Sequence, residues 1–154
     1  MKSLSVTVSQ LVRRPVAEVF RAFVDPDKIT QFWLQAASGP LAQDARVHWD
    51  FMVPGATERV SVTEFKPPCR IAFDWSDGIN VSLDFQGQGK FATRVCVEAK
   101  GFAGTKAVEA ALNATEGFSI VLCDLKTFLE SGRSANLVRD KASLIKQAPA
   151  MSRE

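Results

Sequence analysis

The chain has 154 residues, 46% of them hydrophobic and 23% charged, and its formal net charge is +2. At this length one domain buries about 68–70% of the surface that its unfolded chain exposes, so a single core suffices without disulfides or metals. A charge balance this weak gives no electrostatic signature of nucleic-acid binding, which needs a clustered basic face. We therefore expect one globular domain and no nucleic-acid partner.

The cysteines and the N-terminal sequence indicate a reducing compartment. Cys69, Cys96 and Cys123 are odd in number, far apart, and form no C-x-x-C pair. They predict neither a disulfide framework nor a zinc site, and we expect no metal and no cofactor. The first residues alternate in polarity, unlike a signal peptide, and no run of eighteen apolar residues occurs. The sequence therefore predicts a cytoplasmic protein without membrane insertion.

The first three elements are predicted from a change in the spacing of apolar residues. Alternation of apolar and hydroxyl side chains over residues 3–8 is typical of a half-buried strand. After Pro15 the apolar residues recur three and four positions apart, which predicts a short helix. Asp25 and Pro26 are typical of the cap and first turn of a second short helix. The apolar faces of the two helices consist of Val16, Val19, Phe20 and Phe23, and of Ile29, Phe32 and Trp33.

Residues 45–100 return to period two and predict an antiparallel meander. Apolar and polar side chains alternate in five runs, and the separators "VPGAT", "KPPC", "SDG" and "GQG" are short and rich in Gly, Pro and Asp. One face of such a sheet is apolar and needs a cover. The apolar positions of the runs are Val47, Trp49 and Phe51; Val60 and Val62; Ile71, Phe73 and Trp75; Val81, Leu83 and Phe85; and Phe91, Thr93, Val95 and Val97.

The cover is predicted to be a long helix over residues 105–130, which Gly132 ends as a C-terminal cap. Its first half is alanine-rich, and its second half carries a dense apolar stripe at helical spacing. Beyond it, only Val138, Ala142 and Ile145 give a weak helical stripe. We expect a single domain over residues 1–132 and a loosely docked or disordered tail over residues 133–154.

Three segments also carry a family resemblance. "RRPVAEVFRAFVDPDKITQFW", "VTEFKPPCRIAFDWSD" and "EGFSIVLCDLKTFLESG" resemble, in order and spacing, the signature blocks of proteins similar to the activator of the heat-shock ATPase. In the third block Gly117 and Phe118 stand where the family commonly has a Gly-Trp pair. That family belongs to the SRPBCC superfamily, which includes START domains, polyketide cyclases and the birch-pollen allergen. The resemblance runs from about Leu4 to Gly132.

The resemblance implies an α+β helix-grip fold. In this fold a curved antiparallel sheet of six or seven strands wraps around the long C-terminal helix, with two short helices after the first strand, and a cavity lies between sheet and helix. Gly117 then either lets the helix bend or lie close to the sheet, or simply marks the start of the helix, because a glycine inside a helix costs about 1 kcal/mol against alanine.

Aromatic residues are the best candidates for ligand binding, because ligand pockets are mainly apolar and aromatic with a few placed polar groups. Most of these rings must belong to the core in any case, and we expect about a third of them to contact a cavity. The candidate ligand-binding residues are Trp33, Trp49, Phe51, Phe73, Trp75, Phe85, Phe91, Phe118 and Leu122.

Polar residues on the strands leave a catalytic alternative open. His48 and Asp50 lie two apart on one strand and therefore share a face, so His48 would act as general base with Asp50 orienting its ring, if that face is internal. Arg94 would bind a ligand carboxylate under the same condition. We favour the solvent face for all three, as for Arg70, Asp74 and Asp84. Cys96 and Cys123 behave as small hydrophobes unless one pairs with His48, the one histidine.

Three functions are compatible with these features. The favoured one is binding of a small hydrophobic or amphipathic ligand in the internal cavity, without a recognisable catalytic group set. The first alternative is a cyclase or hydrolase that uses the same cavity. The second is a regulator of the chaperone ATPase, which we rank last because such regulators use a further N-terminal domain, whereas the first predicted strand begins near Leu4. An exposed sheet edge also allows a homodimer.

Overall fold

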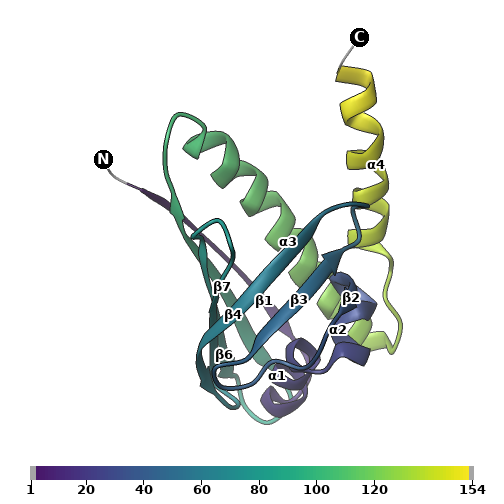
Figure 1. Ribbon diagram of the computed structural model, residues 1–154. Helices are drawn as coiled ribbons and strands as arrows, with labels where there is room; N and C mark the ends of the chain where they lie inside the picture. Colours follow the sequence, from purple (N-terminus) through teal and green to yellow (C-terminus); the bar gives the residue numbers. More distant parts are fainter. Residues whose placement is uncertain (1–2, 153–154) are drawn as a thin grey trace.

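The computed structural model describes residues 3–152 and confirms the α+β architecture. Seven strands form one antiparallel sheet in the order β1-β7-β6-β5-β4-β3-β2. A long helix lies against this sheet, and two short helices follow the first strand, as predicted (Figure 1). In chain order the elements are β1 (Leu4–Val12), α1 (Val16–Val24), α2 (Pro26–Phe32), β2 (Leu34–Ala37), β3 (Arg46–Phe51), β4 (Thr57–Lys66), β5 (Arg70–Asp74), β6 (Asn80–Gly87), β7 (Thr93–Phe102), α3 (Ala107–Ser131) and α4 (Leu137–Ser152).

The sheet builds the core through its alternation. Neighbouring strands pair in register, so that Val8, Val97 and Leu83 lie side by side across β1, β7 and β6. Val97 and Leu83 belong to a continuous apolar core that α1, α2 and α3 complete, and the partly buried Val8 packs against this core. Leu34–Ala37 adds a short edge strand that the sequence pattern does not separate from the second short helix. Alternation is hard to recognise over four residues that directly follow a helical pattern.

The local signals at the helix ends are confirmed. Asp25 Oδ1 accepts a hydrogen bond from the Asp27 backbone N–H at 2.9 Å, which caps α2, and Pro26 occupies the first helical position. Gly132 ends α3 in the left-handed conformation with φ of 82°. No helix within residues 3–152 combines the length and hydropathy that a bilayer-spanning helix needs.

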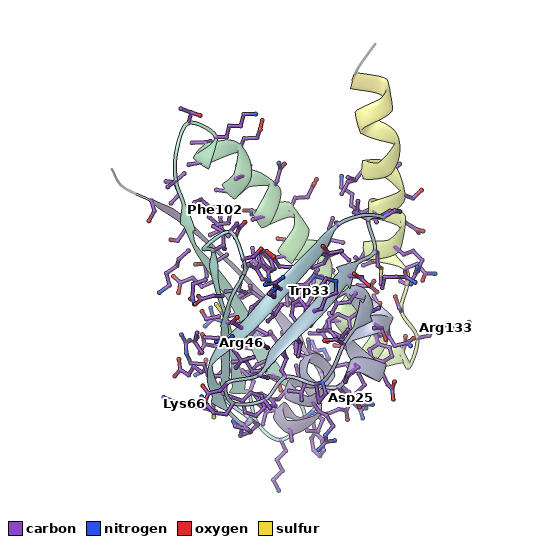
Figure 2. All side chains as sticks on the ribbon, viewed as in Figure 1. Asp25, Trp33, Arg46, Lys66, Phe102 and Arg133 are labelled. Atoms are coloured by element: carbon purple, nitrogen blue, oxygen red, sulfur yellow. The ribbon has the colours of Figure 1, made fainter. Side chains whose placement is uncertain are left out.

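The long helix covers one part of the sheet more closely than the rest. α3 lies mainly against β1 and also contacts β7, which are neighbours at one edge of the sheet. The opposite half, formed by β5, β4 and β3, is covered by aromatic side chains rather than by the helix backbone. Figure 2 shows side chains filling the space between the sheet and α3, with Trp33 among them. This uneven cover leaves room at one end of the core.

The C-terminal segment contains a helix, whereas the sequence predicts a loosely docked or disordered tail there. α4 contacts α3 and α2, and Ala142 on its inner face is only 4% exposed. Figure 1 shows α3 and α4 diverging from the loop that joins them, so the later turns of α4 extend away from the rest of the molecule. Leu144 and Ile145 are correspondingly exposed. The weak apolar stripe is therefore a docking signal, although residues 153–154 lie outside the described part.

Candidate functional site

A pocket of about 270 Å³ lies between the aromatic half of the sheet, α3 and α4, and it is open to solvent on one side. Trp33 and Phe51 form its floor, at the end of α2 and the end of β3. Trp75, which follows β5, closes one side, and the turn between β3 and β4 adds three small or medium apolar residues. The turn residues are Met52, Val53 and Ala56.

The aromatic wall of the pocket is one connected set of rings. Phe118 stacks on Trp75 with ring centroids 5.9 Å apart and an interplanar angle of 13°. Phe118 also meets Trp33 edge to face at 6.0 Å, and Phe51 meets Trp75 edge to face at 6.1 Å. Offset stacks and edge-to-face pairs of this kind hold rings in fixed positions. We call Trp33, Phe51, Trp75 and Phe118 the pocket cluster.

Small residues on α3 keep the pocket from being filled. Ala114 and Gly117 line it beside Ile120 and Val121. Gly117 lies in the middle of α3, ten residues after its start at Ala107, so the interpretation as a helix start is wrong. A Cβ at Gly117 would meet no atom within 4 Å, so close packing against the sheet does not explain the glycine either. Its effect in the structure is empty space next to Phe118.

The remaining wall is α4, which contributes Val138, Lys141, Ala142 and Ile145 to the pocket. These residues recur three and four apart, so they occupy one helical face. α4 therefore closes a side of the pocket that the predicted sheet and long helix would have left open.

Asp124 on α3 holds the start of α4 in place. This fully buried carboxylate accepts hydrogen bonds from Thr127 Oγ1 at 2.9 Å, Ser134 Oγ at 2.6 Å and the Val138 backbone N–H at 3.2 Å. Val138 belongs to the first turn of α4, where backbone N–H groups have no partner within the helix. Asp124 thus caps α4 from the neighbouring helix, and the buried charge is compensated by three donors.

Polar groups are few at the pocket. Lys141 is the one charged residue among the described residues that line it, and its Nζ lies 3.3 Å from Glu116 Oε2. The indole Nε1 of Trp75 is buried and has no hydrogen-bond partner within residues 3–152. An unsatisfied buried donor of this kind costs free energy. No group of three or more His, Cys, Asp or Glu in that range is arranged to hold a metal ion.

Four of the nine predicted ligand-binding residues surround the pocket, and these four form the pocket cluster. Trp49 and Phe73 lie directly behind the pocket cluster. The ring centroid of Trp49 is 5.0 Å from that of Trp33, and the ring centroid of Phe73 is 6.3 Å from that of Trp75. Leu122 is 1% exposed inside the core. Phe85 packs against Phe20 and Phe23 in the part of the core covered by α1, so it does not reach the pocket.

Phe91 lies outside both the strand and the ligand site in which the sequence places it. It precedes β7, which begins at Thr93, and its side chain is 75% exposed in the loop after β6. Residues 88–91 depart from alternation because this loop contains Gly89 in a positive-φ conformation. The ring therefore belongs neither to the apolar face of the sheet nor to the pocket.

The predicted catalytic residues lie on the solvent side of the sheet. His48 Nε2 and Asp50 Oδ1 are 3.0 Å apart, but both side chains are about half exposed and neither lines the pocket. Arg94 is also exposed and does not line this pocket. Arg70 bridges Glu64 and Asp84 on the neighbouring strands, with Nε–Oε1 and Nη1–Oδ2 distances of 2.8 and 2.7 Å. His48 and Arg70 therefore form surface pairs with neighbouring carboxylates and Arg94 is exposed, in agreement with the solvent-face interpretation.

A Cys-His pair is also excluded by the sheet order. Cys96 lies on β7 and His48 on β3, four strand positions apart, which corresponds to roughly 19 Å along the sheet. Burial raises the pKa of the Cys96 thiol, which disfavours the nucleophilic thiolate. Cys123 is exposed on α3, and its Sγ lies 3.7 Å from Gln10 Nε2 on β1, at the edge of the sheet far from β3.

The turn between β3 and β4 and the face of α4 are the parts of the pocket that the sequence does not predict. "VPGAT" carries turn residues, which indicate only a separator between strands. A signal for α4 is present in Val138, Ala142 and Ile145, all three of which line the pocket. Lys141 lies next to this stripe but carries no motif of its own.

A known protein family accounts for most of the chain. A family profile described as "Activator of Hsp90 ATPase homolog 1-like protein" matches residues 13–130, well over half of the sequence. The chain belongs to the AHSA1-like family. This family is part of the SRPBCC superfamily, which agrees with the resemblance of the three sequence blocks. α4 lies beyond the matched residues. No curated protein matches the chain with significance.

Several solved structures share the fold. The protein SSP2350 from Staphylococcus saprophyticus is 27% identical with a TM-score of 0.75, and the match covers 85% of this chain and 95% of that one. The Aha1 dimer from Colwellia psychrerythraea is 16% identical with a TM-score of 0.75, covering 85% and 99%. CalU16 from Micromonospora echinospora is 20% identical with a TM-score of 0.66, covering 94% and 86%. The last two likenesses concern the fold alone.

Proposed function

We propose that this AHSA1-like protein binds a small hydrophobic or amphipathic molecule in the pocket between the sheet, α3 and α4. The observation that carries the proposal is the pocket itself, about 270 Å³ in volume and lined by apolar side chains and the pocket cluster. A dry cavity of about 150 Å³ lined by apolar residues is enough to bind benzene. The larger pocket here suits a fused two-ring system or an alkyl chain of similar bulk.

The rigidity of the walls supports the same proposal. The rings of the pocket cluster contact one another and the second row formed by Trp49 and Phe73. A preformed apolar site loses little conformational entropy when a ligand enters, because its side chains are already ordered. Binding would also remove from water the apolar surface that the open side of the pocket exposes, at about 25 cal/mol per Å².

The enzymatic alternative has weaker support. His48, Asp50 and Arg94 lie on the solvent side of the sheet, so a cyclase or hydrolase reaction in this pocket would have to use another group. The regulator alternative draws on the family match alone. A homodimer also stays a prediction, to which the dimeric Aha1 protein from C. psychrerythraea lends support.

Gly117 offers a way to test the proposal by closing the pocket. N-phenyl-1-naphthylamine, a neutral dye whose fluorescence rises in apolar surroundings, is titrated into the protein and into the variant Gly117→Leu. Leucine is a good helix former, and its side chain would extend from α3 into the empty space at the pocket. We expect the dye to bind the unaltered protein and to lose at least tenfold in affinity with Gly117→Leu.

The matched control is Ala110→Leu. This residue lies two helical turns earlier on the same face of α3, is exposed, and does not line the pocket. The control variant should bind the dye like the unaltered protein. Native mass spectrometry of the freshly purified protein adds an independent measurement, because a co-purified ligand shows as a defined extra mass. Absence of dye binding, or equal binding by both leucine variants, would contradict a ligand site in this pocket.

A further inference from the structure

The residues that line the pocket carry few polar side-chain groups. Among the described residues that line it, Trp33 carries an indole N–H, Lys141 an ammonium and Met52 a weakly accepting thioether, whereas the indole Nε1 of Trp75 is buried within the wall. Carboxylate, carboxamide and hydroxyl side chains are not among these residues. The strong side-chain hydrogen-bonding groups are therefore all donors. A ligand that presents acceptors matches this set, whereas a ligand that presents donors finds no strong side-chain partner.

Lys141 is positioned to bind an anionic group of a ligand. Its side chain is 34% exposed and lies at the pocket wall, while its partner Glu116 is 57% exposed and is not among the lining residues. The ion pair between them, at 3.3 Å, is a surface pair of the kind that contributes little net stability. An anionic group at the pocket can thus replace the Glu116 carboxylate, or share the Lys141 ammonium with it, at small cost.

We propose that the ligand is an anionic amphiphile, with an apolar or aromatic body between α3, α4 and the sheet and a carboxylate or similar acid group on Lys141. This inference rests on the proposed function and specifies its ligand class. The aromatic walls alone would also attract a cation, because the faces of Trp and Phe rings carry negative potential. The Lys141 ammonium opposes that choice, since it places a positive charge at the same pocket.

Two dyes with the same ring system test the charge preference directly. N-phenyl-1-naphthylamine is neutral, and 1-anilinonaphthalene-8-sulfonate adds one sulfonate to it. Both are titrated into the full chain and into Lys141→Met, which keeps the apolar stem of the side chain and removes its charge. We expect the sulfonate dye to lose about tenfold in affinity with Lys141→Met, the effect of one charge-assisted contact, and the neutral dye to be unaffected.

Three further variants separate a direct contact from a general change of charge. Lys141→Arg should keep the affinity for the sulfonate dye. Glu116→Gln should raise it, because the competing carboxylate is removed. Lys90→Met makes the same charge change in the loop between β6 and β7 and should affect neither dye. Circular dichroism of each variant confirms that dye binding reports the folded protein.

The outcomes distinguish this inference from the function on which it rests. Equal loss of both dyes with Lys141→Met would show that Lys141 only shapes the pocket, and unchanged binding of both would show that it takes no part. Either result overturns the anionic ligand and leaves the apolar pocket standing. Failure of the neutral dye to bind the unaltered protein, or to respond to Gly117→Leu, would instead overturn the proposed function.

Discussion

The two ends of the apolar core contain similar aromatic residues, but one end is closely packed and the other borders a pocket. At one end Phe20, Phe23, Phe65 and Phe85 meet at centroid distances of 5.2 to 5.6 Å, and α1 covers them. We call this set the packed cluster. At the other end the pocket cluster meets at similar distances but borders a pocket of about 270 Å³. Aromatic content therefore does not distinguish core from site. The difference comes from what covers the rings.

The cover of the packed cluster is dense, whereas the cover of the pocket cluster is made of small residues and a diverging helix. α1 presents buried Val19, Phe20 and Phe23 to the sheet. Over the pocket cluster, α3 presents Ala114 and Gly117, and α4 reaches the pocket with one face while its later turns extend outward. Protein interiors are otherwise close-packed, so such a gap needs small residues on at least one wall.

The largest expected effect comes from truncating one ring in each cluster. Phe85→Ala should lower the free energy of unfolding by about 4 kcal/mol, because Phe85 is 4% exposed and its removal leaves a closed cavity. Phe51→Ala should cost only about 2 kcal/mol, since Phe51 is half-buried and already borders open space. Urea denaturation measures both. Equal losses would contradict the distinction between the two ends.

On dye affinity the order should be reversed, with the larger effect from Phe51→Ala and the smaller from Phe85→Ala. Phe51→Ala removes part of the pocket floor and should weaken binding of N-phenyl-1-naphthylamine, whereas Phe85→Ala should leave the affinity of the remaining folded protein unchanged. A weaker dye affinity in Phe85→Ala would place this ring in the site after all, as its strand pattern predicts.

The difference between the packed cluster and the pocket cluster also shows how far the sequence predicts the site. Alternation identifies which side chains of a strand face the core, so spacing and turn residues predict the strands other than β2, the two short helices and α3. Alternation says nothing about position along the strand or about the residue that lies opposite. Phe51 and Phe85 therefore look alike in sequence, and only the placement of α1 and α3 separates them.

The α4 wall was harder to predict for a different reason. Val138, Ala142 and Ile145 form a stripe too narrow to indicate burial alone, and the anchor that fixes the helix lies on another element. In sequence, Asp124 looks like a polar interruption of the apolar stripe on α3. Its carboxylate is buried because Thr127, Ser134 and the first turn of α4 donate to it, a contact across the loop that no local pattern reveals.

Replacing Asp124 tests whether α4 is a true wall of the pocket. Asp124→Ala leaves three donors without their acceptor and should lower the free energy of unfolding by about 3 kcal/mol. It should also weaken dye binding, because α4 loses its attachment next to Val138. Ser134→Ala removes one donor and serves as the mild control, with a cost of about 1 kcal/mol. Unchanged dye affinity in folded Asp124→Ala would show that the sheet and α3 suffice for the site.

Gly117→Ala should change the free energy of unfolding by a smaller amount and should raise it. Alanine in the middle of a helix is favoured over glycine by about 1 kcal/mol, and its methyl group would meet no atom within 4 Å. We therefore expect a gain of about 1 kcal/mol in the free energy of unfolding. Asn113→Ala, at an exposed position of the same helix, should gain about half as much and calibrates the helix propensity alone. Destabilisation by Gly117→Ala would show that the glycine serves the backbone rather than the pocket.

The smallest expected effect concerns the attachment of α3 near β1, remote from the pocket. Glu130 Oε2 accepts hydrogen bonds from Lys126 Nζ at 2.6 Å and from the Arg13 backbone N–H at 2.8 Å, and the pKa of Glu130 is lowered mainly by the Lys126 contact. Its contribution to stability is therefore fully present above the ordinary glutamate pKa and is lost as the pH falls through the lowered value.

Glu130→Gln should thus cost less than about 1 kcal/mol at pH 7, because the contact is partly exposed. The difference in free energy of unfolding between Glu130→Gln and the unaltered protein should shrink as the pH falls below about 4.5. It should vanish when Glu130 is protonated in both the folded and the unfolded protein. Urea denaturation at a series of pH values measures this, and dye affinity at pH 7 should not change. A constant difference across that range would show that the charge of Glu130 is not what holds α3 to the end of β1, and altered dye affinity would show that this attachment reaches the pocket.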